Sequence, residues 1–330
     1  MAASKQVRNM KALVLNNINQ PLDFQEVDFP FPKKGEVVVE LAASALNHRD
    51  VWITKGQYAG IRFPTILGSD GAGWLEGREV IIHPSLNWGR QQAFQGDQYH
   101  ILGLPVNGTF AEAVAVPRRN VFPKPAHLSL EQAAALPLAG LTAWRAVFSR
   151  CRLKKGEHIL ISGVGGGVAL FALQFAVAAG ARVWVTSGDD AKIARAVQMG
   201  AQGGVNYKTA DWDKQLRAQA GGFHVVIDSA AGDQFARLAG LCFSGGRVGI
   251  YGGTLGKING LSPQIVFWKQ LSILGSTMGS DQDFKKMLAF VEKNEIVPVI
   301  DQVFSLSDGN AALSRMDAGA QFGKIVLRNK

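Results

Sequence analysis

The feature that most constrains the fold is a regular alternation of apolar strands and helical stretches that begins near residue 157. Strand-like segments such as EHILIS, RVWVTS, GGVNY, FHVVIDSA and GGRVGIYGG alternate with helical stretches such as VALFALQFAVAAGA and DDAKIARAVQMGA. Strands that are joined by helices run parallel, and a parallel sheet is covered by helices on both faces. Residues 125–267 are therefore predicted to form an α/β domain with a doubly wound parallel sheet.

The remainder of the chain has a different pattern. Before residue 117, short β-like runs (KALVL, GEVVVELAAS, REVIIH and FAEAVAVP) are separated by Pro and Gly turns. After Phe267, the tail contains a strand-like LSILGST, a helical DFKKMLAFVEKN and a closing strand GKIVLR. We expect this tail to extend the parallel sheet and then return to the β-rich part. The second domain is thus predicted to be discontinuous, with residues 1–124 and 268–330.

A glycine-rich segment, ISGVGGGVA, lies between an apolar strand and a long helix, from Ile161 to Ala169. Glycines allow the backbone to turn sharply and to approach a pyrophosphate, because they have no Cβ. The helix that follows offers unpaired amide donors and a partial positive charge. The alternative is a simple strand-to-helix turn. Together with the alternating strands, the segment favours a dinucleotide-binding loop.

The end of the second strand of a dinucleotide-binding domain selects between NAD and NADP, and here it reads VTSGDD. NAD-binding proteins usually carry an acid at this place to hold the ribose hydroxyls. This chain has Ser187 and Gly188 there, with Lys192 one turn further on and Tyr207 at the end of the third strand. An uncharged small pair beside a cation suits a 2′-phosphate, so NADPH is the expected cofactor.

Two acids complicate this interpretation. Asp189 and Asp190 directly follow Ser187 and Gly188, which we call the selecting pair. Either acidic side chain is close enough in sequence to reach the ribose. Asp is also frequent as the cap of a helix, because its side chain accepts hydrogen bonds from the first amides. We favour the capping role.

The charge of the chain bears on its binding partners. Lys and Arg total 35 and Asp and Glu total 26, which leaves a formal net charge of +9. Such an excess suits a phosphate-bearing cofactor or, less specifically, nucleic acid. The basic residues are dispersed, with only short pairs such as Lys33-Lys34 and Arg118-Arg119. A solvated basic surface is the favoured interpretation, and nucleic acid is not an expected partner.

Other features of the composition are those of an ordinary globular protein. The 330 residues, of which 47% are hydrophobic, are enough for two domains with buried cores. Cys151 and Cys242 are expected to be buried thiols, because two distant cysteines form neither a disulfide scaffold nor a cysteine-based metal site. The N-terminal MAASKQVRNMKALVL contains no apolar leader, and no run is long enough to span a bilayer. A cytoplasmic protein without membrane contact is expected.

Several motifs together resemble the medium-chain dehydrogenase/reductase superfamily over nearly the whole chain. In order, they are ALNHRDVWITKGQY, PTILGSDGAG, NGTFAEAVAVP, AALPLAGLTAWRAV, ISGVGGGVALFALQ and GKIVL. The chain is most similar to the zinc-free branch of quinone oxidoreductase-like and enoyl-reductase-like proteins. This resemblance implies a GroES-like substrate domain at 1–124 and 268–330, a Rossmann domain at 125–267, and a cleft between them. It also implies a homodimer made by continuing the Rossmann sheets near GGRVGIYGG and LSILGST.

The resemblance also implies a set of cofactor contacts. Thr142 would lie near the nicotinamide, and Lys324 in GKIVL matches a basic position near the adenosine phosphate of some NADPH-dependent relatives. An equally weighted alternative for Lys324 is a plain surface lysine. The remaining expected contacts belong to the loop and to the selecting strand ends: Gly165, Gly166, Gly167, Val168, Ser187, Lys192 and Tyr207.

The zinc-binding branch of the superfamily holds its catalytic metal with a Cys, a His in a Gly-His-Glu context and a second Cys. This chain has Asn47, Ser69 in GSD, and a position near Pro137 at the corresponding places. Residues 85–108, where relatives have a four-cysteine lobe, contain no cysteine. The histidines show no metal-binding spacing, although His48 and His83 lie in segments expected to face the cleft. We therefore expect no metal.

By the same resemblance, Asn47 and Tyr58 line the substrate cleft. Tyr58 is the preferred hydrogen-bond donor to the substrate oxygen, and its alternative role is packing at the domain edge. Trp52 stands where some quinone-reductase relatives have a second tyrosine. Asp50 and Asp70 are acid or base candidates, but we favour a structural role in which they accept backbone amide hydrogens.

These expectations lead to three functional hypotheses. The first is a zinc-independent NADPH-dependent oxidoreductase that transfers hydride to a quinone or an α,β-unsaturated carbonyl, since such acceptors delocalise the incoming charge without a metal. The second is an NADPH-dependent aldehyde or ketone reductase, with His48 beside Asn47 as proton donor. The third is an NADPH-binding protein with little turnover that binds nucleic acid, as some members of this branch do.

Overall fold

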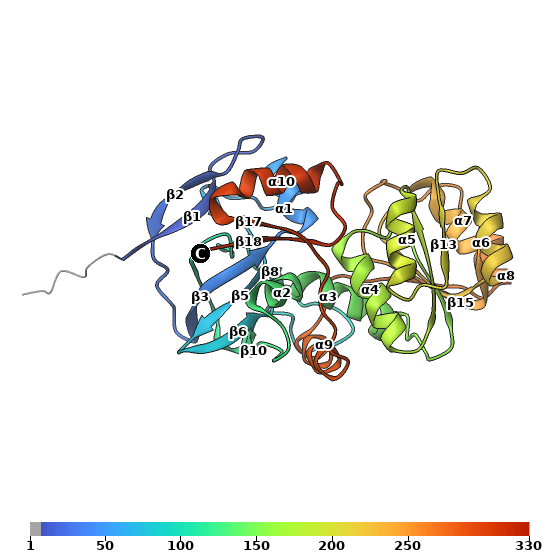
Figure 1. The fold of residues 1–330 in the computed structure, drawn as a ribbon, viewed down its shortest axis with the longest axis horizontal. Coiled ribbons are helices and arrows are strands. Elements are labelled where there is room, and N and C mark those ends of the chain that lie inside the picture. Colours follow the sequence, from blue (N-terminus) through green and yellow to red (C-terminus); the bar gives the residue numbers. More distant parts are fainter. Residues whose placement is uncertain (1–7, 330) are drawn as a thin grey trace, which may run out of the picture. The chain divides into compact units, whose positions relative to one another are not determined.

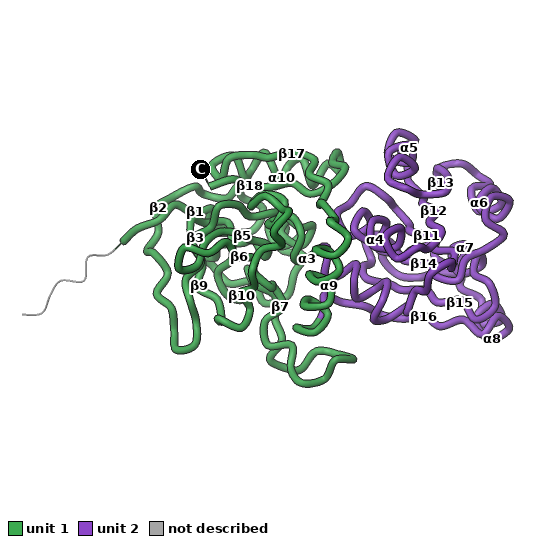
Figure 2. Tube along the Cα trace, turned by 60° about the horizontal axis from the view of Figure 1, so that its bottom comes forward, with its two compact units in different colours: residues 1–138, 280–330 green, residues 139–279 purple. Residues whose placement is uncertain are grey.

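The computed structural model describes residues 8–329, and this part of the chain divides into two compact units (Figure 2). Unit 1 combines the residues up to Leu138 with those from Ser280 onward, and unit 2 is the continuous stretch from Ala139 to Gly279. Unit 2 is thus inserted into unit 1 along the chain.

Both borders lie later than the predicted residues 125 and 267. Helix α2 (Leu130–Ala135) packs against strands β3 (Glu36–Ala45) and β5 (Asp70–Leu75), so it belongs to unit 1. The first border therefore falls within α3 (Pro137–Trp144). Strand β16 (Ser272–Gly275) completes the parallel sheet, which moves the second border beyond it.

In unit 2, helices pack around a parallel sheet (Figure 1). The sheet has six strands in the order β13-β12-β11-β14-β15-β16, which can be followed in Figure 2, and every adjacent pair is parallel. The order reverses between β11 and β14, as it does in a doubly wound fold. The predicted Rossmann sheet is confirmed. The strands that precede β16 are β11 (His158–Ile161), β12 (Arg182–Ser187), β13 (Gly203–Asn206), β14 (Phe223–Asp228) and β15 (Cys242–Ile250).

Helices cover the sheet of unit 2. Apolar side chains of α6 and α7 share a buried cluster with alternate strand residues such as Leu160, Val226 and Val248. Helix α4 packs on β11 and β12, and α5 packs on β12 and β13. Right-handed crossovers place α4 and α5 on the opposite face. The elements are η2 (Arg145–Arg150), α4 (Gly167–Ala178), α5 (Asp190–Gln198), α6 (Trp212–Ala220), η3 (Gly232–Gln234), α7 (Phe235–Gly240) and α8 (Pro263–Trp268).

Unit 1 is mainly β, and most of its strand pairs are antiparallel. Its largest sheet runs β10-β6-β5-β3-β18-β17, with β9 also paired to β3, and a second sheet has the order β2-β1-β4. Strands β7 and β8 form a small pair. The strands are β1 (Asn9–Leu15), β2 (Asp23–Asp28), β4 (Thr65–Ile66), β6 (Arg78–Ile82), β7 (Ser85–Leu86), β8 (His100–Ile101), β9 (Ala113–Pro117), β10 (Val121–Pro123), β17 (Ile300–Ser305) and β18 (Lys324–Arg328).

Strand β18 joins distant parts of the chain within unit 1. It is antiparallel to β3 and parallel to β17, and its apolar side chains Ile325 and Leu327 lie in the same buried cluster as Leu13 of β1. The strand therefore lies inside its sheet rather than at an edge. The other elements are α1 (His48–Thr54), η1 (Arg118–Asn120), α9 (Asp281–Lys293), η4 (Leu306–Asp308) and α10 (Gly309–Asp317).

Two local features of unit 1 correspond to segments that depart from the family pattern. The hairpin between β5 and β6 turns on Glu76 and Gly77, which both have positive φ, so a two-residue turn replaces a longer connection. In the cysteine-free segment 85–108, Trp88 is almost fully buried and meets the ring of Tyr99 edge-on at 5.2 Å. Aromatic packing anchors this segment.

Two further predictions concern the cysteines and the membrane. Cys151 and Cys242 are both buried, as predicted, and burial raises the pKa of each thiol to about 12. Within residues 8–329, no helix combines the length and apolar character that crossing a membrane requires.

Candidate active site

The glycine-rich loop follows β11 at the point where the strand order of unit 2 reverses. Backbone hydrogen bonds from Ser162 to Ile227 of β14 and from Val164 to Thr186 of β12 hold the loop between the two neighbouring strands. Ligands of doubly wound sheets bind outside the carboxyl ends of the strands at this reversal. The loop therefore lies where a dinucleotide site is expected.

The backbone of this loop requires glycine. Gly163 and Gly165 have φ values of 65° and 135°, which side-chain-bearing residues rarely adopt. Gly166 is the N-cap of α4, and a Cβ added there would meet no atom within 4 Å. Gly167 and Val168 open the helix, where the first N–H groups have no partner inside it. The loop thus offers open space and backbone donors to an anion.

Lys192 reaches this loop from α5. A Cβ added to Gly165 would lie 2.9 Å from Cδ and 3.5 Å from Nζ of Lys192. The ammonium group is therefore beside the glycine loop, where it adds positive charge to the helix N-terminus.

A second group of side chains gathers at the ends of β12 and β13. Ser187 is the last residue of β12 and is buried. A Cβ added to Gly188 would lie 2.8 Å from Oη of Tyr207 and 2.9 Å from Cε of Lys208. Lys208 was not among the residues predicted from the sequence, although its place directly after Tyr207 was a usable signal. The structure brings the selecting pair, a phenol and a second lysine together.

The two acids after the selecting pair are already engaged. Asp189 is the N-cap of α5 and accepts a hydrogen bond from the Ala191 amide at 2.9 Å. Asp190 accepts a hydrogen bond from Nδ2 of Asn206 at 3.0 Å. The expected capping role is confirmed for Asp189, and Asp190 instead ties α5 to β13.

Thr142 lies in α3 and is buried. Its hydroxyl donates to Sδ of Met278 at 3.7 Å, within unit 2. Its position near a nicotinamide ring stays a prediction.

In unit 1, Asn47 and Asp50 begin helix α1. The backbone amide of Asn47 donates to Oδ2 of Asp50 at 2.8 Å, and the Asp50 amide donates to the Asn47 carbonyl. Asp70 similarly accepts the Leu138 amide on Oδ1 at 2.7 Å. Both carboxylates thus accept backbone amide hydrogens, which was the favoured structural interpretation. Burial raises the pKa of Asp50 to about 6, against the opposing effect of the Arg49 charge.

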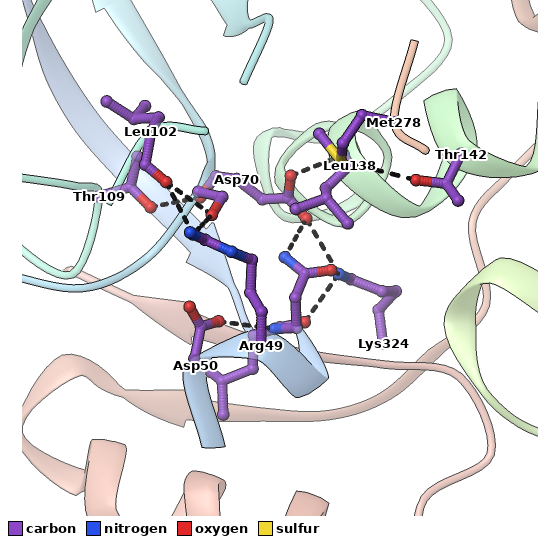
Figure 3. Close-up of polar contacts among 12 residues, drawn as sticks. Arg49, Asp50, Asp70, Leu102, Thr109, Leu138, Thr142, Met278 and Lys324 are labelled. Atoms are coloured by element: carbon purple, nitrogen blue, oxygen red, sulfur yellow. Dashed lines mark hydrogen bonds and ion pairs between the residues drawn. The ribbon is translucent and has the colours of Figure 1, made fainter. Parts of the chain in front are cut away.

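Lys324 lies at the centre of this part of unit 1 (Figure 3). Its ammonium donates to the Leu46 carbonyl at 2.7 Å, to Oδ1 of Asn47 at 2.7 Å and to Oδ2 of Asp70 at 2.9 Å. The residue is 3% exposed, so the alternative of a plain surface lysine is wrong. Its three N–H donors all have acceptors, and a contact with a cofactor phosphate would require one of them to be given up. We call Lys324, Asn47 and Asp70 the lysine cluster.

The lysine cluster bears on whether a catalytic zinc ion fits. Asn47 and Asp70 both face an ammonium, and a divalent cation beside it would be repelled. Ser69 accepts from Nη1 of Arg49 at 2.7 Å and donates to the Leu102 carbonyl at 2.7 Å. No His, Cys, Asp and Glu side chains in the described part of the chain form a group of three that could hold a metal. The arrangement therefore does not suit zinc.

Tyr58 is half-buried and packs against the hydrophobic cluster around β1. The guanidinium carbon of Arg49 lies 5.1 Å from the centre of its ring, a cation–π distance. Sequence reasoning missed Arg49, which is a buried charge that is held by Ser69 and Leu102. The role of Tyr58 toward a substrate stays a prediction.

The two histidines that were expected to face the cleft differ in their surroundings. His48 is the exposed first residue of α1, with its ring 6.1 Å from that of Trp52. Partial desolvation of the ring, and then the charge of Lys324, lower its pKa. The ring of His83 is instead fully buried within unit 1. It stacks on the ring of Phe284 with the centroids 4.4 Å apart, and its Nε2 lies 3.2 Å from Oδ1 of Asp281.

Comparisons with known proteins agree with this architecture. Residues 33–126 match the alcohol dehydrogenase GroES-like domain, and residues 167–293 match the family described as zinc-binding dehydrogenase. The solved structure described as an NAD-dependent alcohol dehydrogenase is 37% identical, with a TM-score of 0.92 over 97% of this chain and all of that one. The predicted GroES-like domain is thereby confirmed.

Two curated relatives extend over almost the same length. The zinc-type alcohol dehydrogenase-like protein YogA of Leptosphaeria maculans is 33% identical over 93% of this chain and 94% of that protein. Quinone oxidoreductase of Rattus norvegicus is 31% identical over 92% of each chain. Family members are oxidoreductases that depend on a nicotinamide dinucleotide. The chain therefore belongs to the medium-chain dehydrogenase/reductase superfamily.

Proposed function

We propose that this protein is a zinc-independent reductase that uses NADPH and transfers hydride to a quinone or an α,β-unsaturated carbonyl. The observation that carries the proposal is the lysine cluster, in which the Lys324 ammonium is bound to Asn47, a residue that stands at the position of a zinc ligand in relatives. Without a metal to acidify an alcohol, the chemistry favours acceptors that delocalise charge themselves. The similarity to quinone oxidoreductase of the rat supports the same class.

The preference for NADPH rests on the side chains at the ends of β12 and β13. Tyr207 and Lys208 offer a hydroxyl and a cation beside the selecting pair, and Lys192 adds a second cation beside the glycine loop. Asp189, the acid nearest to that pair, is occupied as a helix cap. A 2′-phosphate would gain charge-assisted hydrogen bonds here. Gly165, Gly166, Gly167 and Val168 would hold the pyrophosphate, and Thr142 would contact the nicotinamide.

When bound, NADPH supplies a hydride from its nicotinamide ring. The residues of unit 1 then orient the acceptor and stabilise the negative charge that develops on its oxygen. We assign these tasks to Asn47 and Tyr58, whose amide and phenol groups are hydrogen-bond donors. Tyr58 is the donor that can pass a proton to the oxygen.

A second candidate is an aldehyde or ketone reductase, which the similarity to an NAD-dependent alcohol dehydrogenase favours. His48 would be its proton donor. The lowered pKa of His48 means that the ring is neutral at pH 7, and a neutral imidazole is a weak acid. The second candidate is therefore less favoured than the first.

We also propose a homodimer. Strand β16 is the outermost strand of the sheet in unit 2, and Ile273 on it is exposed. An unpaired edge of this kind can pair with its copy around a two-fold axis.

The test begins with chelator-treated protein. NADPH and NADH are titrated separately, and turnover is then measured with a quinone, an enone and a simple aldehyde. We expect tighter binding of NADPH and chelator-resistant reduction of the quinone or the enone. Tighter binding of NADH would contradict the assignment of Lys192 and Tyr207, whereas reduction of the aldehyde alone would favour the second candidate.

A further inference from the structure

The lysine cluster determines how the side-chain amide of Asn47 is oriented. An ammonium only donates hydrogen bonds, and an ionised carboxylate only accepts them. The oxygen of the amide must therefore face Lys324, at 2.7 Å, and its nitrogen must face Asp70, at 2.9 Å. In the reverse orientation, the amide nitrogen would face the ammonium of Lys324, donor against donor, and the amide oxygen would face the carboxylate of Asp70, acceptor against acceptor.

This orientation leaves one polar hydrogen of the amide available. Nδ2 carries two hydrogens, and one of them is donated to Asp70. Within residues 8–329 the second has no acceptor, and Asn47 retains 7% of its surface exposed. What Asn47 can offer to a ligand is thus a donor and not an acceptor.

Lys324 contributes to that donor in two ways. Its contact with Oδ1 fixes one end of the amide while Asp70 fixes the other, so the group cannot pivot. A positive charge at the oxygen also polarises the amide and strengthens its N–H as a donor, because hydrogen bonds in a chain reinforce one another. Both effects depend on the ammonium, which is itself nearly inaccessible.

We propose that Lys324 is a positioning residue of the reduction: it acts through Asn47, whose remaining Nδ2–H stabilises the oxygen of the substrate during hydride transfer. The inference rests on the proposed function. Hydride adds to the β-carbon of an enone, the C=C electron pair shifts toward the carbonyl, and the oxygen becomes negatively charged. NADPH is oxidised to NADP⁺, and a proton from Tyr58 or solvent completes the reduced carbonyl compound.

The competing role for Lys324 is a direct contact with the cofactor phosphate. Such a contact would need a donor from an ammonium whose three hydrogens are already engaged. The two roles predict different kinetics. A cofactor contact affects the affinity for NADPH, whereas a positioning role affects kcat at saturating cofactor.

The test is a double-mutant cycle of the full-length protein with Lys324→Met, Asn47→Ala and the double variant, using an enone and saturating NADPH. Asn47→Ala should lower kcat roughly a hundredfold, as the loss of one oxyanion donor does. Lys324→Met should lower it at least about tenfold, but should have no further effect when Asn47 is already Ala. Additive losses would overturn the proposal, and so would a weaker NADPH affinity with kcat unchanged.

Lys324→Met leaves the Asp70 carboxylate buried without its cation, so a second background is needed in case this variant does not fold. If it does not fold, the same cycle is measured in an Asp70→Asn background, where the members with Lys324→Met contain neither buried charge. Circular dichroism and the thermal midpoint report the fold of each variant. Absence of turnover in the wild type would remove the proposed function and this inference with it, whereas wild-type turnover with an additive cycle would remove the inference alone.

Discussion

The glycine loop of unit 2 and the lysine cluster of unit 1 are two polar sites built in opposite ways. The loop is made of backbone within a single segment, between Ile161 and Ala169. The cluster is made of side chains, and its two side-chain contacts to Lys324 span 277 and 254 residues of sequence. A site made of local backbone is visible in the sequence, whereas a site made of distant side chains exists only after folding.

The two sites also differ in their exposure. The loop leaves space for a ligand, because a Cβ at Gly163 or Gly166 would meet nothing within 4 Å. The cluster is nearly closed, with 4% of the Lys324 side chain, none of the Asp70 side chain and 7% of Asn47 exposed. Substitutions in the loop should therefore affect ligand binding, and substitutions in the cluster should affect stability first.

The largest expected effect is on the stability of the cluster. Lys324→Met should lower the free energy of unfolding by about 3–5 kcal/mol, because it leaves a buried carboxylate unpaired. Adding Asp70→Asn should recover part of this loss, since the charge is then removed as well. Urea denaturation of Lys324→Met, of Asp70→Asn and of the double variant measures both changes in the free energy of unfolding. Equal and additive losses would mean that the two side chains are not coupled.

A smaller effect concerns Asp50, whose carboxylate is close to the cluster. Its pKa is raised from 3.8 to about 6, so its contribution to stability is present below pH 4 and is lost as the pH rises through 6. Asp50→Asn should therefore gain stability relative to the wild type between pH 4 and pH 7, by about 3 kcal/mol. Arg49 and Lys324 oppose the shift and Asp70 adds to it. Urea denaturation at several pH values measures the difference in the free energy of unfolding between Asp50→Asn and the wild type. A difference that does not change with pH would contradict this prediction.

In the loop, Gly165→Ala should weaken NADPH binding by about tenfold, because strain at such a position is on the order of 1–3 kcal/mol. The new Cβ would also press on the Lys192 side chain at 2.9 Å. Gly156→Ala is the matched control, with a φ of 81° and no neighbour within 4 Å. Isothermal titration should find reduced affinity in the first variant only. Similar affinities in both would place the cofactor elsewhere.

The smallest effect concerns the choice between the two cofactors. Lys208→Ala should lower the affinity for NADPH by roughly fivefold, or about 1 kcal/mol, and leave NADH binding unchanged. Lys214→Ala, at another exposed lysine of unit 2, should change neither. Titration with both dinucleotides measures the ratio. An equal loss for both would show that Lys208 does not contact the 2′-phosphate.

What the sequence reveals follows the same division. The alternation of strands and helices gives the sheet of unit 2, and Asp189 follows a strand end where a cap is expected, so both depend on local pattern. The position of α2 does not, because its packing on β3 and β5 depends on strands far away in sequence. Lys324 in GKIVL reads as a polar residue at a strand end. Only the fold reveals that Asn47 and Asp70 surround it.

Strand β18 has a consequence for the order in which the protein is made. A ribosome produces Asn47 and Asp70 first, then the whole of unit 2, and Lys324 only afterwards. Unit 2 is continuous in sequence, so its sheet can form before β18 and Lys324 have been added to the first part of unit 1. A chain that is cut short before residue 324 would retain a complete parallel sheet, but its carboxylate at position 70 would have no counter-ion. Unit 1 can therefore complete its sheet only after β18, the last strand of the chain to be synthesised.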